Sequence, residues 1–388
     1  MREVVLRRVE RVRGRMRRLG LSAIVAYSAP TDLGEGTTTS GNVRALSGWA
    51  DRSHASILVL PVAADPVLLV DSAPRRRWAE AKDVCVRDVR AEERGAPLGA
   101  SVPAILRERH VRGRVGVVGE DEVPAATERA WSQEAGAWVF VPADDVVARE
   151  RMVKTAEEIK LHRAASNISD AMHETVMRQA AVPGVRAWEL LVAMECSGRS
   201  RCADYSSGWI ATGTAPDMLG FDLWQNERSL EERDRIQVGT SVVYQGYWAH
   251  ALRMATRGPA THGLQRAFDV AVAAEDLALE SLRPGARLRD IVAHMTQVID
   301  EHWPLPLGAY RGPQGHALGL DSDDPIVSEV FASPDSPSDL RVEAGMVLAV
   351  HPNFRVPGLG FIGVGDVVLI TASGAELLTR YPRELAQI

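Results

Sequence analysis

Near residue 150 the pattern of the sequence changes, and this change limits the chain to a two-part architecture. Before it, short aliphatic runs alternate with amphipathic segments, which is the pattern of an α/β domain with a partly parallel sheet. We predict such a smaller domain over residues 1–150, with helices near 101–109 and 123–134. Its predicted strands are SAIVAY (22–27), SILVLPV (56–62), PVLLV (66–70), CVRDV (85–89), RVGVVG (114–119) and AWVFV (137–141).

The first twenty residues are rich in arginine, as a transit peptide would be, but their apolar residues recur at helical spacing. Val5, Val9, Val12, Met16 and Leu19 recur at helical spacing, and Gly20 ends the segment before the first strand. We therefore predict an amphipathic helix docked on the first domain rather than a targeting segment.

After residue 150 helices are grouped and strands are paired. A long amphipathic helix is predicted from about Ile159 to the VPG breaker at 182–184. Further helices are expected at 186–196, 261–282 and 288–303, and strands at 207–213, 235–255, 345–352 and 360–371. Residues 151–388 are thus predicted to form an α+β domain with an antiparallel sheet.

The composition excludes several classes of protein. With 46% hydrophobic and 25% charged residues in 388, the chain has the composition of a globular protein. Its formal net charge of -6 predicts no general attraction to nucleic acid or to an anionic membrane, and no apolar run is long enough to span a bilayer. Three scattered cysteines and no secretory signal favour a reducing, cytoplasmic location.

Three histidines stand at the ends of strands or in a Gly-rich loop. His250 lies on the second arm of the 235–255 hairpin, His316 follows the loop YRGPQG, and His351 ends the strand in GMVLAVHPNF. Such histidines are metal-ligand candidates, although a lone histidine in a core is more often a satisfied structural residue. Five others lie on helical or polar segments and are expected to face solvent: His110, His162, His173, His294 and His302.

The chain resembles the creatinase and aminopeptidase P family, whose catalytic domain has the pita-bread fold. The landmarks run in order: NVRALSGW, ERMVKTAEEIKLHRAA, RSLEERDRIQVG, YQGYWAHALRMATRGPA, LRPGARL, GHALGLDSDDP, VEAGMVLAVHPNF and GDVVLITASGAELLT. The resemblance implies a pita-bread domain over 151–388, with an antiparallel sheet flanked by helices. It also implies a homodimer with a shared active site.

The resemblance further implies where metal ligands would stand. Metal-dependent members carry five ligands in the order Asp, Asp, His, Glu, Glu. The first Asp falls on Gly239 and the last Glu on Gly365, whereas the middle three fall on His250, His316 and His351. One of the family's two metals thereby loses two of its three ligands. The other has histidine at three of its four positions.

Imidazoles in place of carboxylates change which metal the site suits. Carboxylates offset the charge of two hard cations, whereas three neutral imidazoles suit a single borderline ion. We therefore predict one divalent transition metal (Zn, Fe, Mn or Cu, its identity open) on His250, His316 and His351.

The resemblance also implies the residues that move protons. A creatinase histidine that serves as general base falls on Asp222, and a second family histidine falls on Asp323. These two carboxylates, with the ligand His316, form the predicted catalytic set. For each Asp taken singly, a solvated loop position explains its presence as well as a catalytic role does.

Four residues form the predicted substrate-binding set: Arg52, Tyr247, Trp248 and Arg253. Arg52 falls near the creatinase arginine that clamps the substrate carboxylate from the neighbouring subunit, and its alternative is a surface arginine. Aromatic residues on a hairpin also commonly pack a core, and Arg253 is also explained as a structural ion-pair partner.

These features support three hypotheses for function. The leading one is a single-metal enzyme. Its metal-bound water attacks the carbon of a C–N or amide bond in a small carboxylate-bearing molecule. A second is an oxygen-dependent oxidase or oxygenase with Fe or Cu on the same histidines. A third is a metal-free creatinase-like hydrolase or a binding protein that has lost catalysis.

Overall fold

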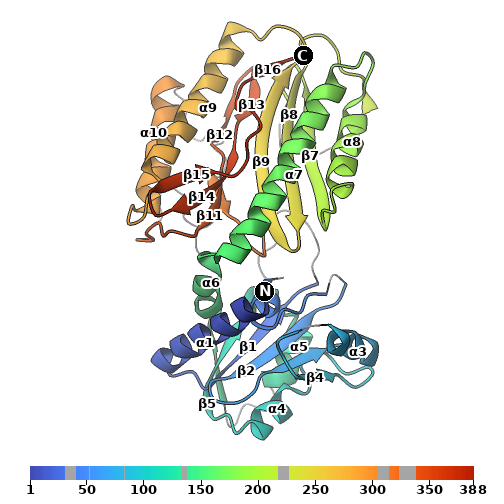
Figure 1. Cartoon of the computed structure of the whole chain (residues 1–388), viewed down its shortest axis with the longest axis vertical. Helices are drawn as coiled ribbons and strands as arrows, with labels where there is room; N and C mark the ends of the chain where they lie inside the picture. The colour runs from blue at the N-terminus through green and yellow to red at the C-terminus, as the bar shows by residue number, and fades with distance from the viewer. Residues whose placement is uncertain are drawn as a thin grey trace. The chain divides into compact units, whose positions relative to one another are not determined.

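The computed structural model describes residues 1–30, 41–51, 53–82, 84–132, 138–216, 227–303, 314–322 and 338–388. The chain divides into two compact units, Met1–Arg151 and Met152–Ile388 (Figure 1). Across the described ranges, no helix combines the length and the apolar character that crossing a bilayer requires. We describe each unit by itself.

The N-terminal unit is a six-stranded mixed sheet in the order β4-β3-β2-β1-β5-β6, with helices on both faces. The parallel pairs are β1–β5, β5–β6 and β3–β4, which confirms the predicted α/β class with a partly parallel sheet. The strands are β1 (Ala23–Ser28), β2 (Ser56–Pro61), β3 (Val67–Val70), β4 (Asp88–Ala91), β5 (Gly113–Val118) and β6 (Trp138–Pro142). The helices are α1 (Arg2–Leu19), α2 (Gly41–Ser47), α3 (Ala73–Ala81), α4 (Val102–Glu108), the 3-10 turn η1 (Glu120–Glu122), α5 (Ala125–Ser132) and α6 (Asp144–Met152).

Helix α1 is docked on this sheet, as predicted. Val5, Val9, Val12 and Met16 are buried, whereas Leu19 in the last turn is 52% exposed, and Gly20 ends the helix in the left-handed conformation with φ of 66°. On its polar side, Arg11 and Arg15 contact the carboxylate of Glu150 at 2.5 and 2.6 Å. The arginines that resemble a transit peptide therefore include ion-pair partners of the folded unit.

The C-terminal unit contains two main sheets, each covered by a pair of helices (Figure 1), and all their strand pairs are antiparallel except β16–β9. One sheet has the order β16-β9-β8-β7 and packs against α7 and α8, and the other has the order β10-β11-β14-β15. A shared core joins α9 and α10 to the second sheet and to the hairpin β12–β13. This is the pita-bread architecture that the resemblance implies.

The bounds of its elements follow the sequence pattern closely. The helices are α7 (Ala156–Ala180), α8 (Ala187–Arg199), α9 (His262–Ser281) and α10 (Leu288–His302). The strands are β7 (Tyr205–Gly213), β8 (Arg235–Tyr244), β9 (Tyr247–Thr256), β10 (Gly315–Ala317), β11 (Val347–Val350), β12 (Asn353–Val356), β13 (Gly360–Gly363), β14 (Asp366–Thr371), β15 (Gly374–Leu377) and β16 (Ala386–Gln387).

Two histidines of α7 are fully buried, so the expectation that they face solvent was wrong. Thr155 and Glu158 cap the helix reciprocally, and the face turned to the sheet contains polar as well as apolar residues. Nδ1 of His162 hydrogen-bonds the carbonyl oxygen of Trp248 at 2.8 Å, and Nδ1 of His173 hydrogen-bonds that of Ser169 at 3.1 Å. Because these polar side chains find partners inside the unit, apolar periodicity alone does not reveal the buried face.

The buried histidines predict a loss of stability in acid. Burial lowers the pKa of both His162 and His173 to about 3, whereas an unfolded histidine titrates near about 6.5. Below about pH 6.5 the unfolded chain therefore binds protons that the folded chain does not. The free energy of unfolding should fall by about 2 kcal/mol per buried histidine by pH 5.

A His162→Gln variant tests this, since its amide does not titrate. Its unfolding free energy, measured by chemical denaturation between pH 7 and 5, should fall by about 2 kcal/mol less than that of the unsubstituted protein. His294→Gln, at an exposed position of α10, is the matched control and should keep the original pH dependence. Equal pH dependence in both variants would contradict the account.

Candidate metal centre

The position of His250 is fixed by the β8–β9 hairpin. Gln245 and Gly246 have positive φ values of 47° and 83°, as a tight two-residue hairpin turn requires. This turn sets the register in which Ser241 pairs with His250 and Gly239 pairs with Leu252. Side chains alternate along a strand, so His250 shares its face of the sheet with these cross-strand partners.

His316 and His351 come from neighbouring strands of the second sheet. His316 on β10 pairs with Ala349 of β11, and His351 directly follows β11. The backbone N–H of His351 donates to the carbonyl oxygen of Gln314 at 3.0 Å, which extends the pairing by one residue before Pro352 ends the ladder.

The three histidines meet in space. Their ring centroids are 5.1 to 5.4 Å apart, and one ligand nitrogen from each lies within 4.8 Å of the others. His250 and His351 are 9% and 7% exposed, and His316 is half-buried. Bonds of about 2.0–2.1 Å to one ion of the size of Zn²⁺ hold ligand nitrogens closer together than this 4.8 Å limit, so the three rings would move slightly inward to share an ion.

Each imidazole is also held through its Nδ1 atom. Nδ1 of His316 lies 3.2 Å from the carbonyl oxygen of Ala317, and that of His250 lies 3.4 Å from the hydroxyl of Ser241. Nδ1 of His351 lies 3.1 Å from the amide nitrogen of Asn353. A contact in which Nδ1–H donates to a carbonyl oxygen, as in His316, orients the ring of a metal-binding histidine and leaves Nε2 for the ion.

Comparisons with known proteins place this geometry in a family. Residues 160–372 match the model of metallopeptidase family M24, and residues 8–153 match that of the creatinase/prolidase N-terminal domain. The chain belongs to metallopeptidase family M24. The resemblance inferred from sequence is confirmed, and the family places the chain among the hydrolases of C–N bonds.

Individual relatives extend over most of the chain. An uncharacterized peptidase of Bacillus subtilis (strain 168), YqhT, is 24% identical over 352 residues, which cover 90% of this chain and 94% of the relative. The Xaa-Pro dipeptidase of Pyrococcus furiosus is 25% identical over 250 residues, or 63% of this chain and 68% of the relative. The crystal structure of the prolidase from Pyrococcus horikoshii OT3 aligns with a TM-score of 0.82 at 18% identity, and covers 98% of this chain and 99% of that one.

Gly239 and Gly365, which stand where the resemblance places two carboxylates, have no room for a side chain. A Cβ atom on Gly239 would overlap the indole of Trp209, and one on Gly365 would overlap Cβ of His351. Trp209 packs edge-on against Phe361, with ring centroids 6.1 Å apart, and Leu252 completes the apolar cluster. The resemblance places carboxylates for a second metal at these two positions. The space that their side chains would need is taken by the indole of Trp209 and by His351.

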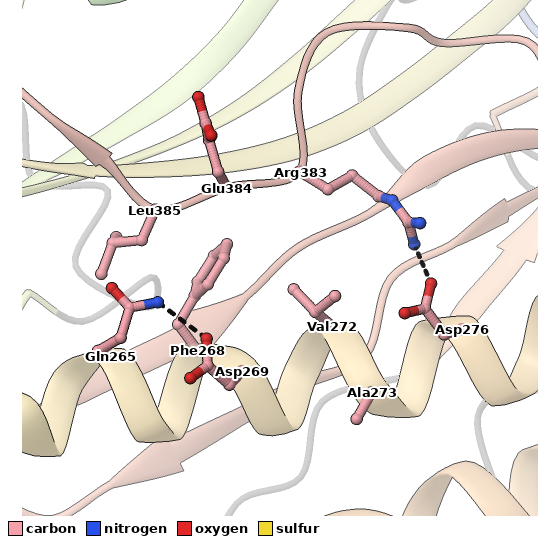
Figure 2. Close-up of a pocket in the computed structure, with 9 residues that line it drawn as sticks. All are labelled: Gln265, Phe268, Asp269, Val272, Ala273, Asp276, Arg383, Glu384 and Leu385. Atoms are coloured by element: carbon pink, nitrogen blue, oxygen red, sulfur yellow. Dashed lines mark hydrogen bonds and ion pairs between the residues drawn. The ribbon is translucent and has the colours of Figure 1, made fainter.

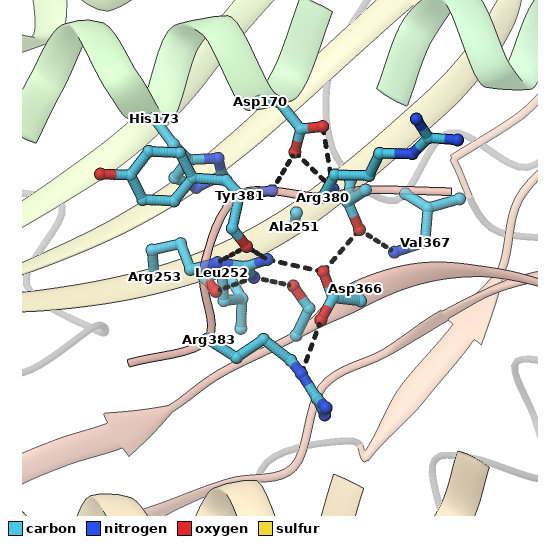
Figure 3. A network of polar contacts seen from close by, with 12 residues as sticks. Asp170, His173, Ala251, Leu252, Arg253, Asp366, Val367, Arg380, Tyr381 and Arg383 are labelled. Carbon is cyan, nitrogen blue, oxygen red and sulfur yellow. Dashed lines mark hydrogen bonds and ion pairs between the residues drawn. The ribbon is translucent and has the colours of Figure 1, made fainter. Parts of the chain in front are cut away.

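Arg253, in the polar network of Figure 3, lies on the face of β9 opposite His250, because side chains alternate along a strand. Its five N–H groups make five hydrogen bonds, to the carbonyl oxygens of Leu252, Gly365 and Tyr381 (two bonds to the last) and to Asp366 at 2.7 Å. The pair of Arg253 and Asp366 is almost completely buried. This is the structural ion-pair role, and it leaves the guanidinium no N–H for the predicted substrate contact.

Two of the other predicted substrate contacts, Tyr247 and Trp248, lie on opposite faces of β9. Tyr247 is turned toward α7, where its hydroxyl donates to Glu158 at 2.9 Å, so it packs the core on the side opposite His250. Trp248 lies on the face of His250 but is only 1% exposed. Arg52, Asp222 and Asp323 lie outside the described residues.

A cavity of about 510 Å³ lies elsewhere in the unit, between α9 and residues 383–385 (Figure 2). Arg383 at its edge pairs with Asp276 at 2.7 Å, and Gln265 hydrogen-bonds Asp269 at 2.8 Å. None of the three clustered histidines lines it. The histidine cluster and this cavity are therefore separate features.

Sequence reasoning missed Ser241, Asn353 and Trp209. Ser241 was within reach, because the Gln245–Gly246 turn fixes which residue pairs with His250. Asn353, two residues after His351, carried no recognisable signal. Trp209 could not be placed, because its contact with Gly239 depends on the pairing of β7 with β8.

The buried Arg253 predicts a large stability effect. Arg253→Met would remove the nearest cation of the buried Asp366 carboxylate and leave it only the longer contact with Arg383 at 3.8 Å, and the loss should cost about 3–5 kcal/mol. Arg257→Met, one residue beyond β9, is the matched control, because the guanidinium of Arg257 contacts carbonyl oxygens of the described residues at long distances of 3.4 and 3.5 Å. Equal unfolding free energies for the two variants in chemical denaturation would contradict the assigned role.

Gly239 predicts a packing conflict that a second substitution relieves. Gly239→Ala should destabilise the protein by about 1–3 kcal/mol because its methyl group overlaps Trp209. In a Trp209→Leu background the same change should cost clearly less, so that the two effects are not additive. Gly263→Ala in α9, where the new methyl group meets open space, is the control and should not destabilise the protein. Strict additivity of the first two changes would show that the indole does not fill the position.

Proposed function

We propose that this chain hydrolyses a C–N bond of a small carboxylate-bearing peptide, with one divalent metal ion held by His250, His316 and His351. The observation that carries the proposal is the meeting of three imidazoles, with ligand nitrogens within 4.8 Å, in a chain of family M24. When bound there, a divalent ion supplies Lewis acidity, which polarises a carbonyl group and eases the ionisation of water.

A single ion follows from the donor set. Three neutral imidazoles bring no negative charge to offset that of two cations. The positions that would complete a second carboxylate site are Gly239 and Gly365, and both are filled by neighbouring side chains. Zn, Fe, Mn and Cu are all compatible with imidazole ligands.

The residues around the cluster have separate tasks in this proposal. Trp209, Leu252 and Phe361 form an apolar cluster, which would border the site on one side. Arg253 holds Gly365 against His351 through the carbonyl oxygen of Gly365 at 2.7 Å. We assign proton transfer to Asp222 and Asp323. In a homodimer, Arg52 of the partner subunit would bind the substrate carboxylate. These assignments rest on the family resemblance.

The choice of first substrates comes from the relatives. The Pyrococcus furiosus relative is named an Xaa-Pro dipeptidase. We propose dipeptides that end in proline as the first substrates to test, since they combine a scissile C–N bond with a free carboxylate.

A second candidate function uses the same ligands. A neutral three-histidine set also suits Fe²⁺ or Cu²⁺, whose chemistry with oxygen requires open coordination positions. Oxygen consumption, together with loss of activity under anaerobic conditions, would select this oxidative function over hydrolysis.

Metal content tests the proposal directly. Protein purified without chelator should contain one transition-metal ion per chain by elemental analysis, and His351→Ala should lose both the metal and the hydrolysis of Xaa-Pro dipeptides. His302→Ala, at an exposed position of α10, is the matched control and should keep both.

Three other results would argue against a single catalytic metal ion. Full activity in metal-free His351→Ala protein would contradict it, and two ions per chain would contradict the single site. Absence of metal, combined with ligand binding without turnover, would select the hypothesis of a binding protein.

A further inference from the structure

Asn353 touches His351 at two atoms. Its amide nitrogen lies 3.1 Å from Nδ1 of the imidazole and 3.0 Å from the carbonyl oxygen of the same residue. Asn353 is 2% exposed, and its backbone carbonyl oxygen accepts a hydrogen bond from the side-chain amide of Gln314 at 3.3 Å. The backbone carbonyl oxygen of Gln314 accepts from the backbone N–H of His351, so Gln314 and Asn353 together fix the turn at His351.

These contacts determine which way the amide of Asn353 faces. A carbonyl oxygen can only accept, so the atom of Asn353 that lies against the carbonyl of His351 must be the NH₂ group. The same NH₂ group faces Nδ1, which must therefore be the acceptor. A neutral His351 held in this way carries its proton on Nε2.

The other two histidines are held differently. Nδ1 of His316 faces the carbonyl oxygen of Ala317 and so carries the proton, which leaves a lone pair on Nε2. Nδ1 of His250 faces the hydroxyl of Ser241, which can donate or accept. Among the three, His351 is thus the one whose outer contact opposes ligation.

Either mode of ligation by His351 disturbs the contact with Asn353. A bond from Nε2 requires the proton to move to Nδ1, where it meets the NH₂ group. A bond from Nδ1 takes the lone pair that the NH₂ group now uses. The free energy of this hydrogen bond is therefore subtracted from the free energy of metal binding.

We propose that Asn353 is a positioning residue that holds metal-free His351 with its proton on Nε2, and thereby weakens the affinity of the three-histidine site for a divalent ion. This inference rests on the proposed metal function. It makes His351 the ligand that sets the affinity of the site, through a residue that does not itself touch the metal.

The first test reads the tautomer without metal. In protein labelled with ¹⁵N-histidine, long-range ¹H–¹⁵N spectra should show Nε2 of His351 protonated and Nδ1 unprotonated, with the signals assigned by their loss in His351→Ala. In Asn353→Leu the preference for this tautomer should diminish. A proton on Nδ1 in the unsubstituted protein would overturn the proposal, whatever the metal content.

The second test reads affinity with Co²⁺ as the probe, followed by its visible absorption. Asn353→Leu removes both hydrogen bonds at similar volume and should lower the Kd about fivefold, the equivalent of a hydrogen bond of about 1 kcal/mol. Asn353→Asp, whose carboxylate accepts from Nδ1–H, should lower the Kd further. Gln297→Leu on the exposed face of α10 is the control for the same chemical change and should leave the Kd unchanged.

The outcomes separate this inference from the proposed function. If the unsubstituted protein binds no Co²⁺, the metal function fails, and the effect on affinity fails with it. If it binds Co²⁺ and Asn353→Leu binds equally or more weakly, only the role of Asn353 is overturned. Asn353→Ala replaces Asn353→Leu if the leucine variant does not fold, with the same expected direction.

Discussion

Two backbone hydrogen bonds between Leu252 and Gly365 join the two sheets of the C-terminal unit, and the candidate centre depends on them. Their lengths are 3.0 and 3.2 Å, and they link β9 to the residue just before β14. His250 stands two residues before Leu252, and Gly365 lies directly against His351. Together with the hydrogen bond from the backbone N–H of Trp248 to the carbonyl oxygen of Gly319 at 3.0 Å, this bridge sets the spacing of the histidines from the two sheets.

Buried charge reinforces the same bridge. Arg253 follows Leu252 and Asp366 follows Gly365, so each strand contributes one member of the ion pair beside the joint. The hydroxyl of Thr379 donates to Asp366 at 2.5 Å, and the backbone N–H groups of Arg380 and Tyr381 donate to Asp170 on α7. The C-terminal segment is thereby tied to the centre by hydrogen bonds and charge rather than by apolar contact alone (Figure 3).

Glycine at positions 239 and 365 is compatible with the packing around the three histidines, whereas a larger residue is not. Glycine at 239 gives the indole of Trp209 its space, and glycine at 365 allows the backbone to approach His351 closely. A carboxylate restored at either position would need a neighbour to move. The nature of the centre is therefore set by packing as well as by the choice of ligands.

The sequence predicted the fold well because its periodic segments are long and punctuated by glycine and proline. The meeting of His250, His316 and His351 was predictable only through the family resemblance, since their spacing along the chain says nothing of sheet-to-sheet pairing. The β4 strand was predicted at 85–89 but lies at Asp88–Ala91, because its apolar signal is short. His162 and His173 were misjudged because hydrogen bonds to backbone carbonyls, invisible in the sequence, permit their burial.

The central claim is that this fold holds one ion among three imidazoles. The most direct measurement is a crystal structure of the protein grown with zinc, with anomalous data collected on both sides of the zinc absorption edge. We predict a single anomalous peak bonded to nitrogens of His250, His316 and His351, and none beside Gly239 and Gly365. A second peak at those glycines, or a peak with no contact to the three histidines, would contradict it.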